Sequence, residues 1–262
     1  MPTLMTEQGI VHYETLGRGR PVLLLHGWLG SWELWRQTLD ILSEEYKVYA
    51  LDFFGFGESR DHRGNFSVDN YVQSVDQFME QMGIVRAPLI GHSMGGTVSL
   101  AAAVRSPKRI VKVAVIGSPI DGKSLNWLLK LSGHRGTARV FWTAPALLKA
   151  FLRLYGFYIA RDGRKVGSMI VKDVSKINVD SFFQSIGTLR ETDLRGQIDG
   201  LTLPVLGVYG PHDRIVNPDQ AKMLKAHVPH SEIAWMKGSG HFPMMDEPDA
   251  FHQHINAFLA SS

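Results

Sequence analysis

Residues 90–96 read Ile-Gly-His-Ser-Met-Gly-Gly, and this stretch decides the fold. It follows an apolar run at Pro88–Ile90 and precedes a run of small residues at Thr97–Arg105, so we expect a strand, a sharp turn and a helix. A serine on such a turn adopts a strained backbone angle and projects its hydroxyl, while flanking glycines remove side chains that would collide with it. The pattern predicts that Ser93 is a nucleophile.

A serine hydroxyl attacks well only when a base takes its proton, and the natural base is an imidazole held by a carboxylate. Asp213 follows the apolar run Val205–Tyr209, and His241 follows Ile233–Met236 after a Lys-Gly-Ser-Gly segment. Loops after the carboxyl ends of strands face the ligand in α/β sheets. We therefore expect Asp213 to be the acid and His241 the base, in the chain order Ser, Asp, His that separates this triad from the chymotrypsin and subtilisin types.

Acyl transfer also needs hydrogen-bond donors for the oxyanion. Gly27 follows the apolar run Val22–Leu25 and lets the backbone approach the nucleophile, so that the amide of Trp28 points into the pocket. The amide of Met94, directly after the nucleophile and at a helix start, is the natural second donor. These two amides form the predicted oxyanion hole, and His26 is interpreted as a brace for the loop.

Short apolar runs and helical patterns alternate along most of the chain. Runs such as Val48–Leu51 and Val111–Ile116 are nearly continuous in Val, Ile and Leu, which is typical of parallel strands covered on both faces. Ser67–Met82 carries one apolar stripe, a serine that can cap its start and a glycine after its end, which predicts a helix. Leu4–Thr6 and Ile10–Thr15 indicate an antiparallel hairpin at the sheet edge. The fold class is therefore α/β, with a mostly parallel sheet and helices on both faces.

Strand patterns disappear between residues 119 and 195, where successive helical segments indicate an insertion. The segments are Lys123–Leu131, Arg139–Tyr155, Asp162–Val174 and Val179–Glu191. This block holds 13 Lys and Arg against 6 Asp and Glu, a net charge of +7, while the remainder holds 15 against 19, a net charge of −4. Such a basic face is either simply solvated or attracts anionic substrates or lipid headgroups. We expect most of its aromatic residues to form the core of the insertion, and Trp142 and Phe157 to contact substrate.

Taken together, these motifs resemble those of the α/β-hydrolase superfamily, in particular its capped serine esterases and lipase-like members. The resemblance rests on the His-Gly pair at 26–27, the segment Asp-Phe-Phe-Gly-Phe-Gly-Glu-Ser at 52–59, the turn at 90–96 and the loops carrying Asp213 and His241. It covers nearly the whole chain outside 119–195. It implies an α/β-hydrolase core at 1–118 and 196–262, a helical cap at 119–195, and nucleophile, acid and base at Ser93, Asp213 and His241.

The leading functional hypothesis is hydrolysis of a carboxylic ester through an acyl-enzyme. Dehalogenases and epoxide hydrolases of the superfamily use an aspartate where Ser93 stands, so the sequence argues against both. Lactone hydrolases use the same parts as esterases, and carbon–carbon bond hydrolases keep the serine but commonly carry Asn where this chain has His92. A ligand receptor built on the same fold is a further alternative, which multiple turnovers would exclude.

Composition excludes several other classes of protein. A net charge of +3 is too near balance for a nucleic-acid binder, and the lack of cysteine rules out disulfides and thiolate-bound metals or clusters. Gly-Phe-Gly at 55–57 starts like a dinucleotide fingerprint, but Arg60 stands at the third glycine position. We expect no cofactor, no metal site, no transmembrane segment and at most weak contact with lipid surfaces. The expected protein is cytoplasmic, a monomer or homodimer, and acts on a small ester.

Overall fold

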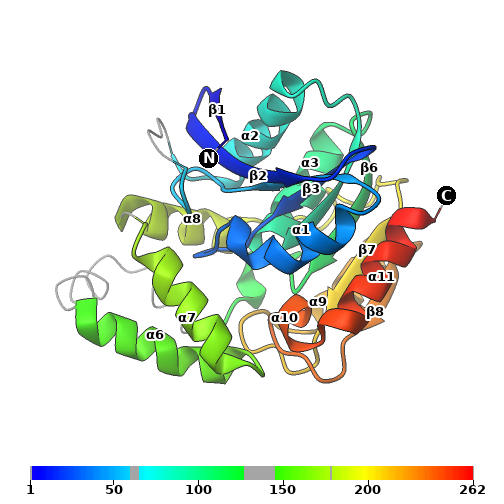
Figure 1. The fold of residues 1–262 in the computed structure, drawn as a ribbon. Helices are drawn as coiled ribbons and strands as arrows, with labels where there is room; N and C mark the ends of the chain where they lie inside the picture. The colour runs from blue at the N-terminus through cyan, green and yellow to red at the C-terminus, as the bar shows by residue number, and fades with distance from the viewer. Residues whose placement is uncertain (1, 60–64, 127–144, 178, 262) are drawn as a thin grey trace.

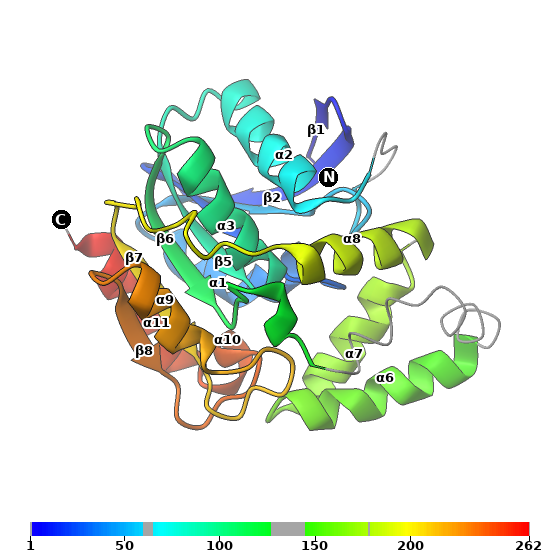
Figure 2. The same cartoon turned by 180° about the vertical axis from the view of Figure 1, so that it is seen from behind.

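An eight-stranded sheet runs through the centre of the protein (Figures 1 and 2). The computed structural model describes residues 2–59, 65–126, 145–177 and 179–261. The spatial order of the strands is β1-β2-β4-β3-β5-β6-β7-β8, and all pairs from β4 to β8 are parallel. The strands are β1 (Thr3–Thr6), β2 (Gly9–Leu16), β3 (Pro21–Leu25), β4 (Lys47–Leu51), β5 (Ala87–His92), β6 (Ile110–Ile116), β7 (Val205–Tyr209) and β8 (Glu232–Trp235).

The central strands are buried on both faces, as their continuous apolar runs predict. Leu24 of β3 is fully buried and pairs with Ala50 of β4 on one side and Ile90 of β5 on the other. The predicted hairpin is also confirmed, because β1 and β2 pair antiparallel and β2 in turn pairs antiparallel with β4. The prediction of a mostly parallel sheet with an antiparallel edge is therefore correct.

Helices cover both faces of this sheet. In Figures 1 and 2, α1 and α11 lie over one face, and α2, α3 and α9 lie over the other. The predicted helix at 67–82 is confirmed, since the side chain of Ser67 caps α2 by accepting a hydrogen bond from the amide of Asn70. The bounds are η1 (Trp32–Trp35), α1 (Arg36–Leu42), α2 (Val68–Gln81), α3 (Met94–Arg105), α9 (Gln220–His227), α10 (Pro243–Asp246) and α11 (Pro248–Ala260).

Between β6 and β7, the described residues form three further α-helices, which are called the inserted helices: α6 (Pro145–Ile159), α7 (Gly163–Val174) and α8 (Val179–Glu191). They lie beyond the carboxyl ends of the strands, to one side of the sheet (Figure 1). Two ion pairs fasten α7 and the residues after it to the core, Lys172 with Glu33 and Lys176 with Glu58. In the described part of the chain, no helix combines the length and apolar character needed to cross a membrane.

The start of this region differs from the sequence prediction. Instead of a helix from Lys123, the structure has the short 3-10 helix η2 (Gly122–Ser124), after which Leu125 forms a bridge with Val216. The remainder of the predicted segment, 127–131, lies outside the described residues, as does 139–144 of the next one. Leu125 is buried in the pocket wall described below, and an extended backbone carries it there where a helical turn was expected.

Candidate active site

Ser93 stands at the junction of β5 and α3 with a backbone angle φ of 50°. Among the described residues, Leu29 is the other non-glycine residue with a positive φ. A side chain in this region is strained, and such strain is retained where the surrounding structure enforces it. A Cβ atom at Gly91 would lie 2.3 Å from the backbone of Gly95, and one at Gly95 would lie 2.2 Å from the carbonyl oxygen of Leu25. Both glycines are therefore required for the turn, as the sequence pattern predicts.

Asp213 and His241 meet in the loops that follow β7 and β8. The Nδ1 atom of His241 lies 2.7 Å from Oδ2 of Asp213, and both side chains are buried. The other carboxylate oxygen of Asp213 accepts the amides of Ile215 and Val216, at 2.8 and 3.0 Å. These bonds fix the carboxylate, so that it orients the imidazole and leaves Nε2 of His241 as the nitrogen available to act as a base.

His92 connects the turn that carries the serine to the loop that carries His241. Its Nε2 atom donates a hydrogen bond of 2.8 Å to the carbonyl oxygen of His241, and the two rings lie 4.7 Å apart. Burial, followed by the proximity of His241, lowers the pKa of His92 well below its usual range, so the ring is neutral. The backbone amide of His241 in turn donates to the carbonyl of Ile159 at the end of α6. Sequence reasoning missed both contacts, which join residues far apart in the chain.

The loop after β3 forms a second wall of the site. His26 bonds the carbonyl of Gly27 through Nδ1 at 2.7 Å and accepts the amide of Phe53 through Nε2 at 2.9 Å. Burial lowers the pKa of His26, and this neutral ring braces the loop. The indole of Trp28 donates to the carbonyl of Phe182 in α8 at 3.3 Å, so the loop is also attached to an inserted helix.

Asp52, an acidic residue near the site, has a structural role. Its carboxylate accepts the amides of Trp32 and Glu58 and bonds Nδ1 of His12. A Cβ atom at Gly57, where φ is +55°, would lie 2.2 Å from this carboxylate. Asp52 therefore organises the glycine turn at residues 55–57, and its partners leave it no part in orienting His241.

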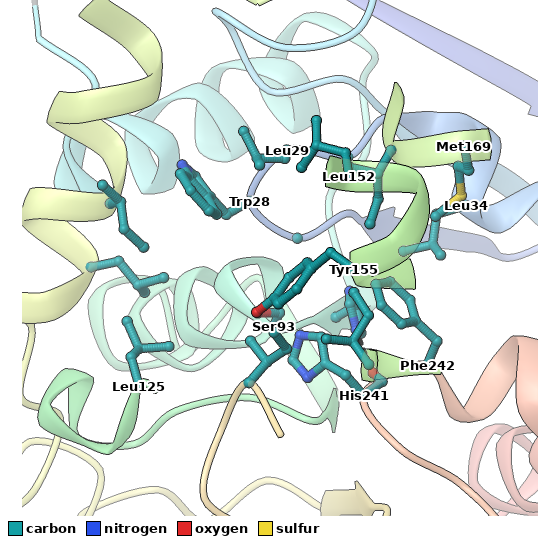
Figure 3. A pocket seen from close by; sticks show the side chains of 18 residues that line it. Trp28, Leu29, Leu34, Ser93, Leu125, Leu152, Tyr155, Met169, His241 and Phe242 are labelled. Atoms are coloured by element: carbon teal, nitrogen blue, oxygen red, sulfur yellow. Dashed lines mark hydrogen bonds between the residues drawn. The ribbon is translucent and has the colours of Figure 1, made fainter. Parts of the chain in front are cut away.

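Ser93 and His241 line one pocket, which the inserted helices close from the opposite side (Figure 3). The inserted helices contribute apolar side chains and one tyrosine, namely Leu152, Tyr155, Ile159, Met169, Ile170, Ile186 and Leu189. The cavity has a volume of about 70 Å³. No Asp, Glu, Lys or Arg belongs to the described residues that line it, so the part of the wall that the structure describes offers a bound ligand no ionic partner.

The candidate site residues differ in how the structure places them. Trp28 lines the pocket beside Ser93, whereas Met94 is fully buried at the start of α3, where a first-turn amide has no acceptor within its own helix. Trp142 lies outside the described residues. Phe157 is 62% exposed and does not line the pocket, so the structure gives no support to the expectation that it contacts substrate. The pocket face of α6 carries Leu152, Tyr155 and Ile159, and a helical residue two positions from such a stripe points away from it.

The structure combines a mostly parallel sheet, a strained serine on a strand–helix turn and an Asp–His pair beside the same pocket. This combination is typical of one class of α/β proteins. A family model described as the alpha/beta hydrolase fold matches residues 20–248. The chain belongs to the alpha/beta hydrolase fold family, and the prediction of an enzyme of this family is confirmed.

Relatives span the whole chain at low identity. A pimeloyl-[acyl-carrier protein] methyl ester esterase of Vibrio parahaemolyticus is 27% identical over 257 residues, which is 95% of this chain and 97% of that protein. The crystal structure of an enol-lactonase from Burkholderia xenovorans has a TM-score of 0.87 at 20% identity and covers 99% of this chain and 100% of that one. An esterase from Exiguobacterium antarcticum has a TM-score of 0.84 at 18% identity, with 97% and 96% covered. The two structures support the fold alone.

Proposed function

We propose that the chain is a serine hydrolase that cleaves carboxylic esters, with Ser93, His241 and Asp213 as its triad. The observation that carries this proposal is the 2.7 Å bond between His241 and Asp213 beside a pocket that also contains Ser93 in a strained backbone conformation. The relative from Vibrio, which is named as a methyl ester esterase, supports an ester in preference to other acyl compounds.

The reaction begins when Oγ of Ser93 attacks the ester carbonyl and His241 takes the hydroxyl proton on Nε2. Asp213 keeps the imidazole oriented and stabilises its charged form. His241 then gives the proton to the alkoxy oxygen, the alcohol leaves, and an acyl-enzyme remains. Water, deprotonated by the same histidine, attacks the acyl-enzyme, and His241 returns this proton to Oγ of Ser93 as the acid is released. No step needs a cofactor.

The amides of Trp28 and Met94 are the proposed donors to the oxyanion. Their positions support this assignment, because the loop after β3 lines the pocket beside Ser93 and Met94 is the first residue of α3. We further propose that residues 119–195 form a cap over a core made of 1–118 and 196–262. This division is supported by α6, α7 and α8, each of which supplies apolar side chains to the wall opposite Ser93.

The small apolar cavity favours short neutral acyl groups. A water molecule needs about 10–15 Å³ of such space, so about 70 Å³ accommodates a short acyl or alkoxy group. A lactone is the second candidate substrate, because the same groups cleave a cyclic ester and the fold is shared with an enol-lactonase.

The proposal is tested with p-nitrophenyl butyrate and a fluorophosphonate probe. We expect many turnovers per protein molecule and labelling of Ser93, both lost in Ser93→Ala, and a kcat lower by about 10⁴-fold in Asp213→Asn because the base loses its tautomer partner. Labelling that persists in Ser93→Ala would refute the nucleophile. A single stoichiometric burst without turnover would instead indicate a receptor.

A further inference from the structure

Tyr155 carries a buried hydroxyl that has no hydrogen-bond partner among the described residues. The residue lies on α6, and Figure 3 shows its side chain extending from that helix across the pocket toward the region of Ser93 and His241. Buried polar groups in proteins are nearly always paired, so an unpaired one in a substrate pocket points to a partner on the ligand.

The surroundings of the hydroxyl indicate which part of the ligand it meets. In Figure 3 the side chain of Tyr155 extends toward Ser93 and His241, so its phenol faces the part of the pocket that His241 lines. The alkoxy oxygen of a bound ester must lie on this side, because it receives its proton from His241. The carbonyl oxygen lies instead toward the proposed donors Trp28 and Met94.

We propose that the hydroxyl of Tyr155 donates a hydrogen bond to the alkoxy oxygen of the ester as the bond to the alcohol breaks. This role rests on the proposed ester hydrolysis. Tyr155 retains its own proton while His241 delivers the one that leaves with the alcohol. The hydrogen bond stabilises negative charge that develops on the alkoxy oxygen, so it assists acylation of Ser93 and has no part in the hydrolysis of the acyl-enzyme, from which the alcohol has gone.

The ionisation behaviour of the phenol agrees with a donor. Burial chiefly, with smaller contributions from Tyr158 and Asp213, raises the pKa of Tyr155 well above its usual range. The hydroxyl therefore stays protonated at neutral pH and well above it.

Tyr155→Phe is a conservative test because it deletes the oxygen and keeps the ring. That ring stacks between Phe151 and Tyr158, at centroid distances of 5.7 and 5.9 Å, and a phenylalanine ring fills the same space. Tyr158→Phe is the matched control, since Tyr158 is 44% exposed, lies on the same helix and does not line the pocket.

The decisive comparison uses two esters of one acid, ethyl butyrate and p-nitrophenyl butyrate. They form the same acyl-enzyme, and kcat/KM reports its formation. Ethoxide is a poor leaving group that needs a donor, whereas p-nitrophenolate leaves with little help. In Tyr155→Phe we expect kcat/KM to fall about tenfold for ethyl butyrate, the effect of one hydrogen bond, and less than threefold for p-nitrophenyl butyrate. We expect Tyr158→Phe to match the wild type on both.

Every other outcome of the two-ester comparison overturns a specific part of the proposal. Equal losses on both esters, or no loss on either, would overturn the role of Tyr155 and indicate that its hydroxyl only fills the pocket or binds water. A wild-type protein that turns over neither ester would refute the proposed function and this role together. If the wild type hydrolyses the esters and Tyr155→Phe changes kcat/KM equally for both, the role of Tyr155 alone is refuted.

Discussion

Asp173 provides a prediction about stability that the structure makes quantitative. This aspartate lies on α7 and is only 1% exposed. One carboxylate oxygen accepts a 2.9 Å hydrogen bond from the hydroxyl of Ser31, and the other has no partner among the residues that the structure describes. Burial, chiefly, raises its pKa from 3.8 to about 7; Glu33 and Asp52 raise it further, and Ser31 and Lys176 oppose the change. The folded protein therefore favours the neutral carboxyl near neutral pH.

The effect of this pKa on stability has a definite sign. Below pH 3.8 the carboxyl is protonated in both the folded and the unfolded chain, and its ionisation does not affect the free energy of unfolding. Between pH 3.8 and about 7 only the unfolded chain loses the proton, so the free energy of unfolding falls as pH rises. Above pH 7 the loss in free energy of unfolding stays constant at about 4 kcal/mol. This value follows from the difference of roughly three units between the two pKa values, at about 1.4 kcal/mol per unit.

Asp173→Asn removes the ionisation and keeps an oxygen that accepts from Ser31. We expect the difference in free energy of unfolding between Asp173→Asn and the wild type to grow in favour of the variant by about 2–3 kcal/mol from pH 5 to pH 8. Urea unfolding at several pH values, followed by circular dichroism, measures this difference. Asp180→Asn is the control, because Asp180 is an exposed carboxyl on the neighbouring α8. A difference between Asp173→Asn and the wild type that stays constant across this range would contradict a raised pKa of Asp173.

Two further predictions concern the pocket and the serine turn. Leu152→Ala enlarges the pocket, so we expect the kcat/KM for p-nitrophenyl octanoate to rise about tenfold relative to that for p-nitrophenyl butyrate. The control Phe157→Ala changes an exposed side chain outside the pocket and should leave this ratio unchanged. The reverse result would contradict the assignment of Leu152 to the pocket wall. Gly91→Ala places a Cβ atom 2.3 Å from the backbone of Gly95, so we expect thermal unfolding to report a loss of at least about 2 kcal/mol. The control is Gly187→Ala in α8, where a Cβ atom would have no neighbour within 4 Å among the described residues, so this substitution should be neutral or stabilising. Equal effects of the two substitutions on stability would show that the backbone shifts to accommodate a Cβ atom at position 91.

Much of the fold could be predicted from local sequence, because the strands of this sheet are covered on both faces. A run such as Val22–Leu25 is apolar at every position and has a single reasonable interpretation. The turn at Ser93 was equally predictable, since only glycine fits at positions 91 and 95 and both glycines are visible in the sequence. The loops after β7 and β8 followed from the rule that ligand-facing residues lie at the carboxyl ends of parallel strands.

The inserted helices were predictable as helices but not in their orientation. Helix α6 is apolar around much of its circumference, with Leu147, Phe151, Leu154 and Phe157 exposed, so its sequence does not reveal which side meets the pocket. Contacts such as Ser31 with Asp173 depend on how two distant segments pack, and no local pattern encodes them. The unpaired hydroxyl of Tyr155 became apparent only once the rest of the pocket wall was in place.

Both main-chain polar groups of His241 are engaged, the amide by the carbonyl of Ile159 and the carbonyl by the ring of His92. Every amino acid offers a carbonyl, so the bond from position 159 survives substitution of the side chain there. The inserted helices can thus diversify in sequence over evolutionary time without losing this contact to the histidine. A chimera that exchanges these helices between relatives must preserve the backbone path at position 159 more strictly than the residue that occupies it.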